Sequence, residues 1–243
     1  ADRTLAVMLP RLSFFINENV ELVGSWKTIG PKPSQATLRN TRNTHFLIEG
    51  QTIKKRLKAR PYDSSKNDFG SAILFAGSYG MMGAAVLATR SASRSGCGKV
   101  TCHAPQCGYE IMQTSVPSAL FQSDRGERAI ETVELTHNYS AVAIGPGIGT
   151  SDRTIGALES FLKIASANKR PVILDADALN CIAIRPSMLD YLPVLSIITP
   201  HAGEFDRIFG PQPSSSARLA KAIEISMSYK IIIVLKGYYT ATV

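Results

Sequence analysis

Residues 71–100, "SAILFAGSYGMMGAAVLATRSASRSGCGKV", contain the pattern that decides the fold. A short apolar run ends at a glycine turn, a helical stretch follows, and a second glycine turn leads into another apolar run. The same succession recurs along the chain at "SAVAIGPGIGT" (140–150), "PVILDAD" (171–177), "LSIITPHAG" (195–203) and "IIIVLKG" (231–237). Apolar runs that alternate with helices are typical of a parallel sheet covered on both faces. We therefore predict an open α/β domain from about residue 45 to residue 243.

The composition agrees with a globular domain. The chain has 243 residues, of which 44% are hydrophobic and 19% charged, which is usual for a soluble protein with a core. No run approaches the ~20 apolar residues of a membrane span. The apolar patch near the N-terminus contains Arg11 and lacks a small-residue cleavage site, so no secretory signal is predicted. A cytoplasmic location is expected.

Charge and cysteine usage exclude two further classes. The net charge is +8, but the densest basic cluster, "KKRLKAR" (54–60), has no interleaved aromatic residues. It favours a solvated linker or the attraction of an anionic ligand over a nucleic-acid partner. The cysteines form no C-x-x-C pair, so neither a zinc site nor a redox motif is indicated, and buried free thiols are expected at Cys97, Cys102, Cys107 and Cys181.

Ligands of open α/β sheets bind beyond the carboxyl ends of the strands, so the residues after each apolar run are the candidates. After the run 71–76 come Gly77, Gly80 and Gly83, a spacing that fits a tight turn and an anion site about equally well. "SGCGKVT" (95–101) is not a P-loop, because Ser93 stands at the position of its first glycine and Val100 follows the lysine.

The loop "AIGPGIGTSDRT" (143–154) is the stronger glycine signal. Gly145, Gly147 and Gly149 directly follow an apolar run, and such a loop exposes N–H groups to a phosphate. Ligand binding is favoured over a plain turn here. Thr150, Ser151 or Asp152 is expected to cap the next helix.

Charged side chains follow the last three runs. Asp177 is placed to cap a helix, whereas Asp175 is predicted to face the cleft, where it could hold a metal-bound water or ligand hydroxyls. His201, with Glu204 near it, is interpreted as a ligand contact rather than a structural histidine. Lys236 offers a charge for phosphate, Gly237 allows a base or ribose to pack on the backbone, and Thr240 adds a hydroxyl.

Together these stretches resemble the ADP-dependent NAD(P)H-hydrate dehydratases of the ribokinase-like superfamily. The resemblance runs in order through "GSYGMMGAAVLATRSASRSGCGKV", "AIGPGIG", "VILDADALN", "ITPHAGEF" and "IVLKGYYT". It implies a ribokinase-like three-layer α/β/α sandwich with a mostly parallel sheet over residues 45–243. Upstream, "LPRLSFFINENVELVGSW" resembles the end of an NAD(P)H-hydrate epimerase domain. Residues 1–27 are therefore expected to be an epimerase tail, and residues 28–44 a linker.

The resemblance implies an enzyme that restores hydrated NADH or NADPH, with ADP or ATP as co-substrate, Mg²⁺, and K⁺ as a further candidate ion. A homo-oligomer with no nucleic-acid or membrane partner is expected. The residues implied to hold the hydrate are Met81, Met82, Gly83, Gly145, Gly147 and His201. Those implied to hold the nucleotide are Lys236, Gly237, Tyr238, Tyr239 and Thr240.

The family pattern continues beyond Val243 to a Gly-Asp segment whose aspartate acts as the base. No other acid matches that role by motif, so no catalytic base is assigned, and the chain as printed is expected to be inactive or severely impaired. Three alternatives stay open at this point: a small-molecule kinase of the same superfamily, a non-catalytic nucleotide-binding protein, and an α/β domain whose glycines only form tight turns.

Overall fold

A computed structural model describes residues 1–41 and 44–243. The chain divides into two compact units: residues 1–64 with 214–216, and residues 65–213 with 217–243.

The first unit contains a small parallel sheet of β1 (Arg3–Val7) and β2 (Ser25–Ile29). Between the strands lie η1 (Leu12–Phe15), η2 (Asn17–Asn19) and α1 (Val20–Val23). The Trp26 ring packs on Phe14 and Phe15, with centroids 6.1 Å and 5.6 Å away. β2, "SWKTI", has polar residues and no continuous apolar run, so the sequence does not mark it as a strand.

Two short helices follow in this unit, α2 (Gln35–Asn40) and α3 (Gly50–Lys54). The predicted boundary at 27/28 falls inside β2, and residues 42 and 43 of the predicted linker lie outside the described residues. The division into an epimerase tail at 1–27 and a linker at 28–44 stays a prediction.

The second unit is built on a sheet that has the order β10-β9-β8-β7-β6-β3-β4-β5 in the described chain. All neighbours in it are parallel except β10, which runs antiparallel to β9. The strands are β3 (Ser71–Phe75), β4 (Lys99–Ala104), β5 (Leu120–Ser123), β6 (Ala141–Ile144), β7 (Ile173–Leu174), β8 (Ile197–Ile198), β9 (Ile232–Leu235) and β10 (Ala241–Thr242).

The strand order reverses between β3 and β6. The chain first builds outward through β4 and β5, then returns beside β3 and builds the other way through β7, β8 and β9. Such a reversal opens a crevice at the carboxyl ends of the two central strands, where ligands of open α/β sheets bind. The loops after β3 and β6 meet at this point.

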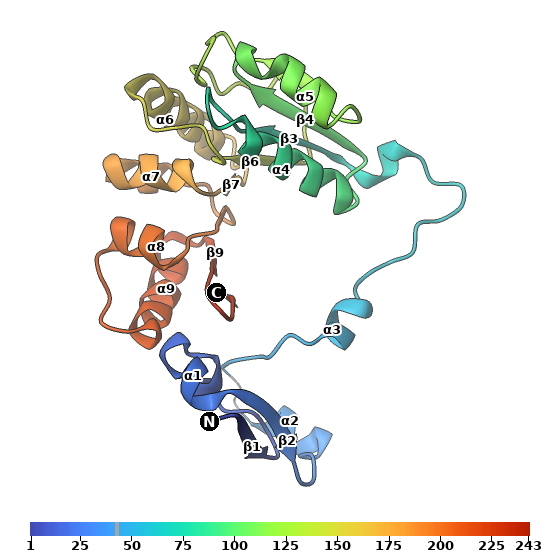
Figure 1. The fold of residues 1–243 in the computed structure, drawn as a ribbon, viewed down its shortest axis with the longest axis vertical. Helices are drawn as coiled ribbons and strands as arrows, with labels where there is room; N and C mark the ends of the chain where they lie inside the picture. Colours follow the sequence, from blue (N-terminus) through green and yellow to red (C-terminus); the bar gives the residue numbers. More distant parts are fainter. Residues whose placement is uncertain (42–43) are drawn as a thin grey trace. The chain divides into compact units, whose positions relative to one another are not determined.

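A helix follows each of β3, β4, β6, β7 and β8, as predicted (Figure 1). Ser151 caps α6, whose Thr154 N–H donates to the serine Oγ at 3.2 Å, so the expected cap is confirmed at one of its three candidates. The helical elements of this unit are η3 (Lys66–Phe69), α4 (Met82–Arg94), η4 (Gln106–Gly108), α5 (Tyr109–Ser115), α6 (Asp152–Ala167), α7 (Asp177–Ile184), η5 (Pro186–Tyr191) and α8 (Ala202–Phe209). Helix α9 (Ser215–Tyr229) begins in the short segment assigned to the first unit.

Two apolar clusters form the core. The larger one joins Ile73 and Phe75 of β3 to buried residues of α6, α7, α8 and α9. The smaller one joins Cys102 and Ala104 of β4 to buried residues of α4 and α5. Burial by both helix sets confirms the predicted α/β architecture with a mostly parallel sheet. In the described part of the chain no helix is long and apolar enough to cross a bilayer.

The cysteines are all free, but only half of them match the expectation of burial. Cys102 and Cys181 are buried, and burial raises the pKa of their thiols to about 11 and about 12, which keeps them protonated and unreactive. Cys97 and Cys107 are partly exposed, so the prediction of burial was wrong for them: Cys97 lies in the connection between α4 and β4, and Cys107 lies in the short helix η4.

Candidate functional site

The loops after β3 and β6 pack directly on one another at the switch point. Gly77 N–H donates to the Pro146 carbonyl at 2.8 Å, and the buried Ser78 Oγ donates to the Gly147 carbonyl at 2.8 Å. A Cβ on Gly147, which has φ +70°, would stand 2.9 Å from the Met81 carbonyl oxygen. The structure therefore brings the predicted 81–83 turn and the Gly145–Gly149 loop together.

The glycines of the first loop divide into two kinds. Gly77 has φ +86°, which L side chains rarely adopt, and a Cβ there would also lie 3.0 Å from the Ala85 Cβ. A Cβ at Gly80 or Gly83 would meet open space, so the backbone at these positions is open to a ligand. The Met82 side chain is buried in the smaller core cluster, so that of the predicted pair only Met81 exposes its side chain.

Gly145 holds the second loop against the end of β7. Its φ is +139°, and a Cβ would lie 1.8 Å from the Asp175 carbonyl oxygen. Asp177 also serves this contact, because its Oδ2 accepts from Gly149 N–H at 2.9 Å. The prediction that Asp177 caps the next helix was wrong: Ala176 is the N-cap residue of α7, and the carboxylate reaches back to the glycine loop instead.

Three charged residues from separate strand ends meet beyond β7, β8 and β9. Lys236 Nζ lies 2.8 Å from Asp175 Oδ1 and 3.8 Å from Glu204 Oε2. Glu204 is buried, whereas the side chains of Lys236 and Asp175 are 41% and 36% exposed and so accessible to a ligand. Asp175 thus neutralises the lysine that was expected to bind phosphate, and its contact with a ligand stays a prediction.

His201 has a structural role that the sequence interpretation missed. It is the N-cap of α8, and its Nδ1 accepts from Gly203 N–H at 3.0 Å and Glu204 N–H at 3.2 Å. Glu204 Oε2 accepts from His201 N–H at 2.8 Å and completes a capping box. The side chain is still 55% exposed at the ligand edge, so a ligand contact stays open as a prediction.

The predicted nucleotide loop links β9 to β10. Lys236 N–H donates to the Pro200 carbonyl at 2.8 Å, which fixes the start of the loop against the end of β8. Gly237, Tyr238 and Thr240 are exposed, and the Tyr238 and Tyr239 rings contact edge to face with centroids 5.0 Å apart. The loop is therefore anchored at one end and open to solvent.

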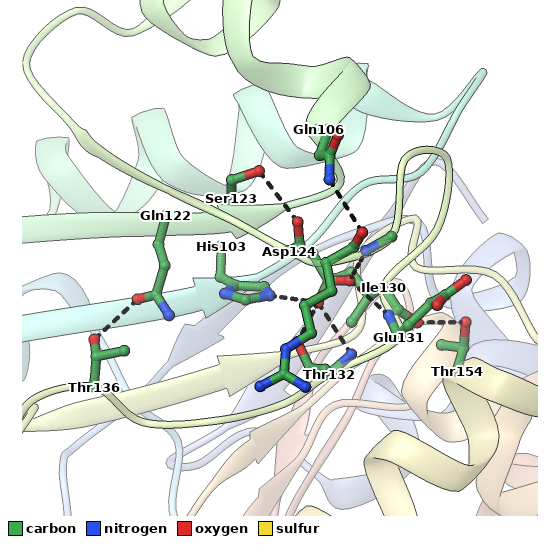
Figure 2. A network of polar contacts seen from close by, with 12 residues as sticks. His103, Gln106, Gln122, Ser123, Asp124, Ile130, Glu131, Thr132, Thr136 and Thr154 are labelled. Carbon is green, nitrogen blue, oxygen red and sulfur yellow. Dashed lines mark hydrogen bonds and ion pairs between the residues drawn. The ribbon is translucent and has the colours of Figure 1, made fainter.

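Sequence reasoning missed a buried polar network around Asp124, which directly follows β5 (Figure 2). Asp124 Oδ2 lies 2.8 Å from His103 Nε2 and also accepts from Thr132 N–H at 3.0 Å and Thr132 Oγ1 at 2.7 Å. Asp124 Oδ1 accepts from Gly126 N–H at 2.7 Å and Glu131 N–H at 2.9 Å. The strand that leads into it was not predicted, and an Asp-x-Gly turn was the only sequence signal.

This network keeps Asp124 ionised. Burial is the largest single effect and would raise the pKa of Asp124, but the hydrogen bonds from His103, Thr132, Glu131 and Gly126 together hold that pKa well below its usual range. The His103 Nδ1 atom, in contrast, is buried without a hydrogen-bond partner among the described residues. A carboxylate with this many donors fixes the loop 124–132 to β4.

The acidic residues at the edge of the sheet limit how a metal would be held. Within residues 1–41 and 44–243, no group of three or more His, Cys, Asp or Glu side chains is placed to hold an ion. Mg²⁺ commonly uses one or two carboxylates together with substrate phosphates. Asp175 and Glu204 fit that mode, in which most ligands come from the bound nucleotide and water.

Comparisons with known proteins agree with this geometry. The family profile described as NAD(P)H-hydrate dehydratase matches residues 72–243. A solved ADP/ATP-dependent NAD(P)H-hydrate dehydratase from Bacillus subtilis, co-crystallised with ATP and Mg²⁺, superposes with a TM-score of 0.62 at 32% identity, covering 78% of this chain and 66% of that one. A ribokinase-like superfamily protein from Enterococcus faecalis superposes with a TM-score of 0.64 at 20% identity, covering 83% of this chain and 71% of that one.

 At 20% identity, this second likeness shows only that the two proteins share a fold.

The curated relatives extend beyond this chain. The bifunctional NAD(P)H-hydrate repair enzyme Nnr of Thermofilum pendens is 28% identical over 254 residues, which cover 99% of this chain and 46% of that protein. The chain therefore spans about half the length of the curated relatives of this kind.

The sheet order, the helices on it and the structural likeness define an α/β protein with the ribokinase-like fold. Since the family profile covers most of the chain, the protein belongs to the NAD(P)H-hydrate dehydratase family.

Proposed function

We propose that this chain is the dehydratase part of a nicotinamide-nucleotide repair enzyme, which converts hydrated NADH or NADPH to NAD(P)H at the expense of ADP. The observation that carries the proposal is the family match over residues 72–243. Within this range the glycine loops contact each other, and the charged residues at the strand ends contact each other. If the glycines only formed tight turns, there would be no reason for these loops and charged residues to lie together at the switch point.

The chemistry requires two ligands side by side. The β-phosphoryl group of ADP is transferred to the ring hydroxyl of the hydrate, and AMP leaves. The phosphate ester then departs as inorganic phosphate while the ring nitrogen's lone pair restores the double bond and a ring proton is lost. Hydroxide is a poor leaving group and phosphate a good one, so phosphorylation is the step that makes dehydration possible.

The two halves of the crevice suit these two ligands. The 81–83 turn, Gly145, Gly147 and the exposed edge of His201 are proposed to hold the hydrate. Lys236 and the residues Gly237 to Thr240 are proposed to hold the nucleotide, with ATP as a second candidate donor. Mg²⁺ would accompany its phosphates and reach Asp175 or Glu204, while K⁺, a homo-oligomer and a cytoplasmic location stay predictions.

The test uses the protein as its gene encodes it. Hydrated NADH is supplied with ADP, and NADH absorbance and AMP are followed together; the proposal expects both to rise in equal amounts. Phosphorylated hydrate without NADH would identify a kinase of the same superfamily instead. Failure of the encoded protein to use either hydrate with ADP or ATP would contradict the dehydratase assignment.

The ion pair between Lys236 and Asp175 gives a prediction about nucleotide affinity. In Asp175→Asn the lysine loses its 2.8 Å partner and becomes available to phosphate. Because exposed ion pairs contribute up to about 1 kcal/mol, we expect ADP to bind roughly three- to fivefold more tightly without Mg²⁺. Calorimetric titration with ADP measures this, and Asp190→Asn, at an exposed aspartate of η5, is the matched control.

The same experiment separates two roles of Asp175. If binding of Mg²⁺–ADP weakens in Asp175→Asn while binding of ADP alone tightens, the carboxylate also serves the metal. Weaker binding of ADP alone would contradict the competition between Asp175 and phosphate, and would favour a direct contact between Asp175 and the nucleotide.

A further inference from the structure

The loop 124–132 is fixed more firmly than its exposure would suggest. Asp124 receives the five hydrogen bonds described above, and it is buried while the neighbouring Arg125, Glu127 and Arg128 are exposed. A buried carboxylate with several donors restricts the backbone that carries it. The loop is therefore held in one conformation although most of its charged side chains face water.

This loop is joined to the glycine loop of the proposed hydrate site. Tyr79 N–H donates to the Arg128 carbonyl at 2.8 Å, so that the two loops are hydrogen-bonded along their backbones. Gly126 and Glu127 carbonyls accept from Gln106 N–H at 3.1 Å and Cys107 N–H at 3.0 Å, which fixes the loop to the end of β4 as well. Arg128 is thus placed beside the residues that follow β3.

The Arg128 side chain stacks on an exposed aromatic ring. Its guanidinium carbon lies 3.5 Å from the centroid of the Tyr79 ring, and Tyr79 is 61% exposed. None of the described carboxylates forms an ion pair with Arg128, whereas Arg153 and Arg185 are paired with Glu131 and Glu159. A guanidinium that is stacked, and not neutralised by a carboxylate, keeps its edge donors free for an anion.

The position on the sheet indicates which ligand this anion would belong to. Arg128 follows β5 and Tyr79 follows β3, on one side of the switch point, whereas Lys236 follows β9 on the other side. The side that carries Arg128 also carries the 81–83 turn proposed for the hydrate. An anionic group of the hydrate, rather than of ADP, would therefore meet Arg128.

We propose that Arg128, held over the Tyr79 ring, binds a phosphate group of the dinucleotide substrate. This inference rests on the proposed function and extends it to a substrate-binding residue outside the family motifs noted in the sequence. A planar guanidinium can donate two parallel hydrogen bonds to phosphate, and its stacking on Tyr79 restricts it before the ligand arrives. Asp124 acts as a positioning residue, because it holds the loop that carries Arg128.

The test measures binding of NADPH hydrate and NADH hydrate to the protein by calorimetric titration. Arg128→Gln is expected to raise the dissociation constant for a hydrate about tenfold, because a charge-assisted hydrogen bond is lost at an exposed site. Arg125→Gln removes an equal charge from the same loop and should change the dissociation constant for a hydrate less than twofold. A rise limited to NADPH hydrate would place the guanidinium at the extra phosphate of that substrate, and an equal rise for both would place it at the shared diphosphate.

Two further readouts separate substrate binding from other roles. Arg128→Gln should leave the dissociation constant for ADP within about twofold of wild type, and Arg128→Lys should restore part of the hydrate affinity. A lower unfolding temperature with unchanged hydrate affinity, equal effects of the two glutamine variants, or a loss confined to ADP would each overturn the inference. If the wild-type protein bound neither hydrate, the proposed function itself would fail, and the inference with it.

Discussion

Asp124→Asn is expected to destabilise the fold by about 3–5 kcal/mol at neutral pH, because the buried carboxylate takes part in five hydrogen bonds and the amide would leave buried donors without an acceptor. For a protein of this size, that loss lowers the unfolding midpoint by on the order of 10 °C. An amide offers one acceptor oxygen where the carboxylate has two, and its NH₂ group would face the donors of Gly126 and Glu131 or of His103 and Thr132.

The effect should depend on pH in a defined direction. The folded-state pKa of Asp124 is lowered, so its contribution to stability is present above the unfolded-state pKa of about 3.9 and is lost as the pH falls through the lower folded-state value. The difference in unfolding free energy between wild type and variant should therefore be full at pH 7 and shrink below about pH 4. Urea unfolding at both pH values measures it.

The control is Asp190→Asn, which removes an exposed carboxylate from η5 and should change the free energy of unfolding by less than about 0.5 kcal/mol. A loss in Asp124→Asn that is small at pH 7, or that grows as the pH falls, would show that the charge on Asp124 does not hold the loop.

Gly145→Ala is expected to disrupt the site as well as the fold. The new Cβ would lie 1.8 Å from the Asp175 carbonyl oxygen, and alanine rarely adopts φ +139°. Since the obstacle is backbone, the loop or the end of β7 must move, and we expect a loss of about 3 kcal/mol or more together with reduced affinity for the hydrate. Thermal unfolding and hydrate titration on the same preparation measure both.

Gly156→Ala is the matched control for this change. Gly156 lies within α6, and a Cβ there would meet no atom within 4 Å. Because alanine favours helix over glycine, this variant should gain about 0.5–1 kcal/mol. If Gly145→Ala retained wild-type stability, the close approach of the glycine loop to Asp175 would not be a requirement of the fold.

The sheet could be predicted largely from the sequence, because most of its strands are apolar runs that end at glycine or a charged residue. β5 was missed since "LFQS" has only two apolar residues in a row and lies at the edge of the sheet, where one continuous apolar run is not needed. β7 and β8 were recognised from "PVILDAD" and "LSIITP", although only two residues of each are paired as strand. The apolar character of a run reports its burial, not how much of it is hydrogen-bonded to neighbours.

The site was predicted as a set of positions rather than as a set of contacts. Lys236 and Asp175 are 61 residues apart, and only the strand order puts their side chains within 2.8 Å. Gly145 and Gly147 were predicted to bind a ligand. In the structure each of them also avoids a clash with a backbone carbonyl, of Asp175 and Met81 respectively. Periodicity and spacing identify which residues reach the edge of the sheet, and tertiary packing decides what they touch there.

The cap formed by His201 has a consequence for proton transfer. Because Nδ1 accepts two backbone N–H groups, it carries no hydrogen, and the neutral ring must be the tautomer protonated at Nε2. The nitrogen available to a ligand is then a donor, able to polarise a carbonyl or stabilise a phosphate oxygen. Since Nε2 holds its proton already, this neutral imidazole cannot take one from the hydroxyl of the proposed substrate, and another group would be the base in the proposed reaction.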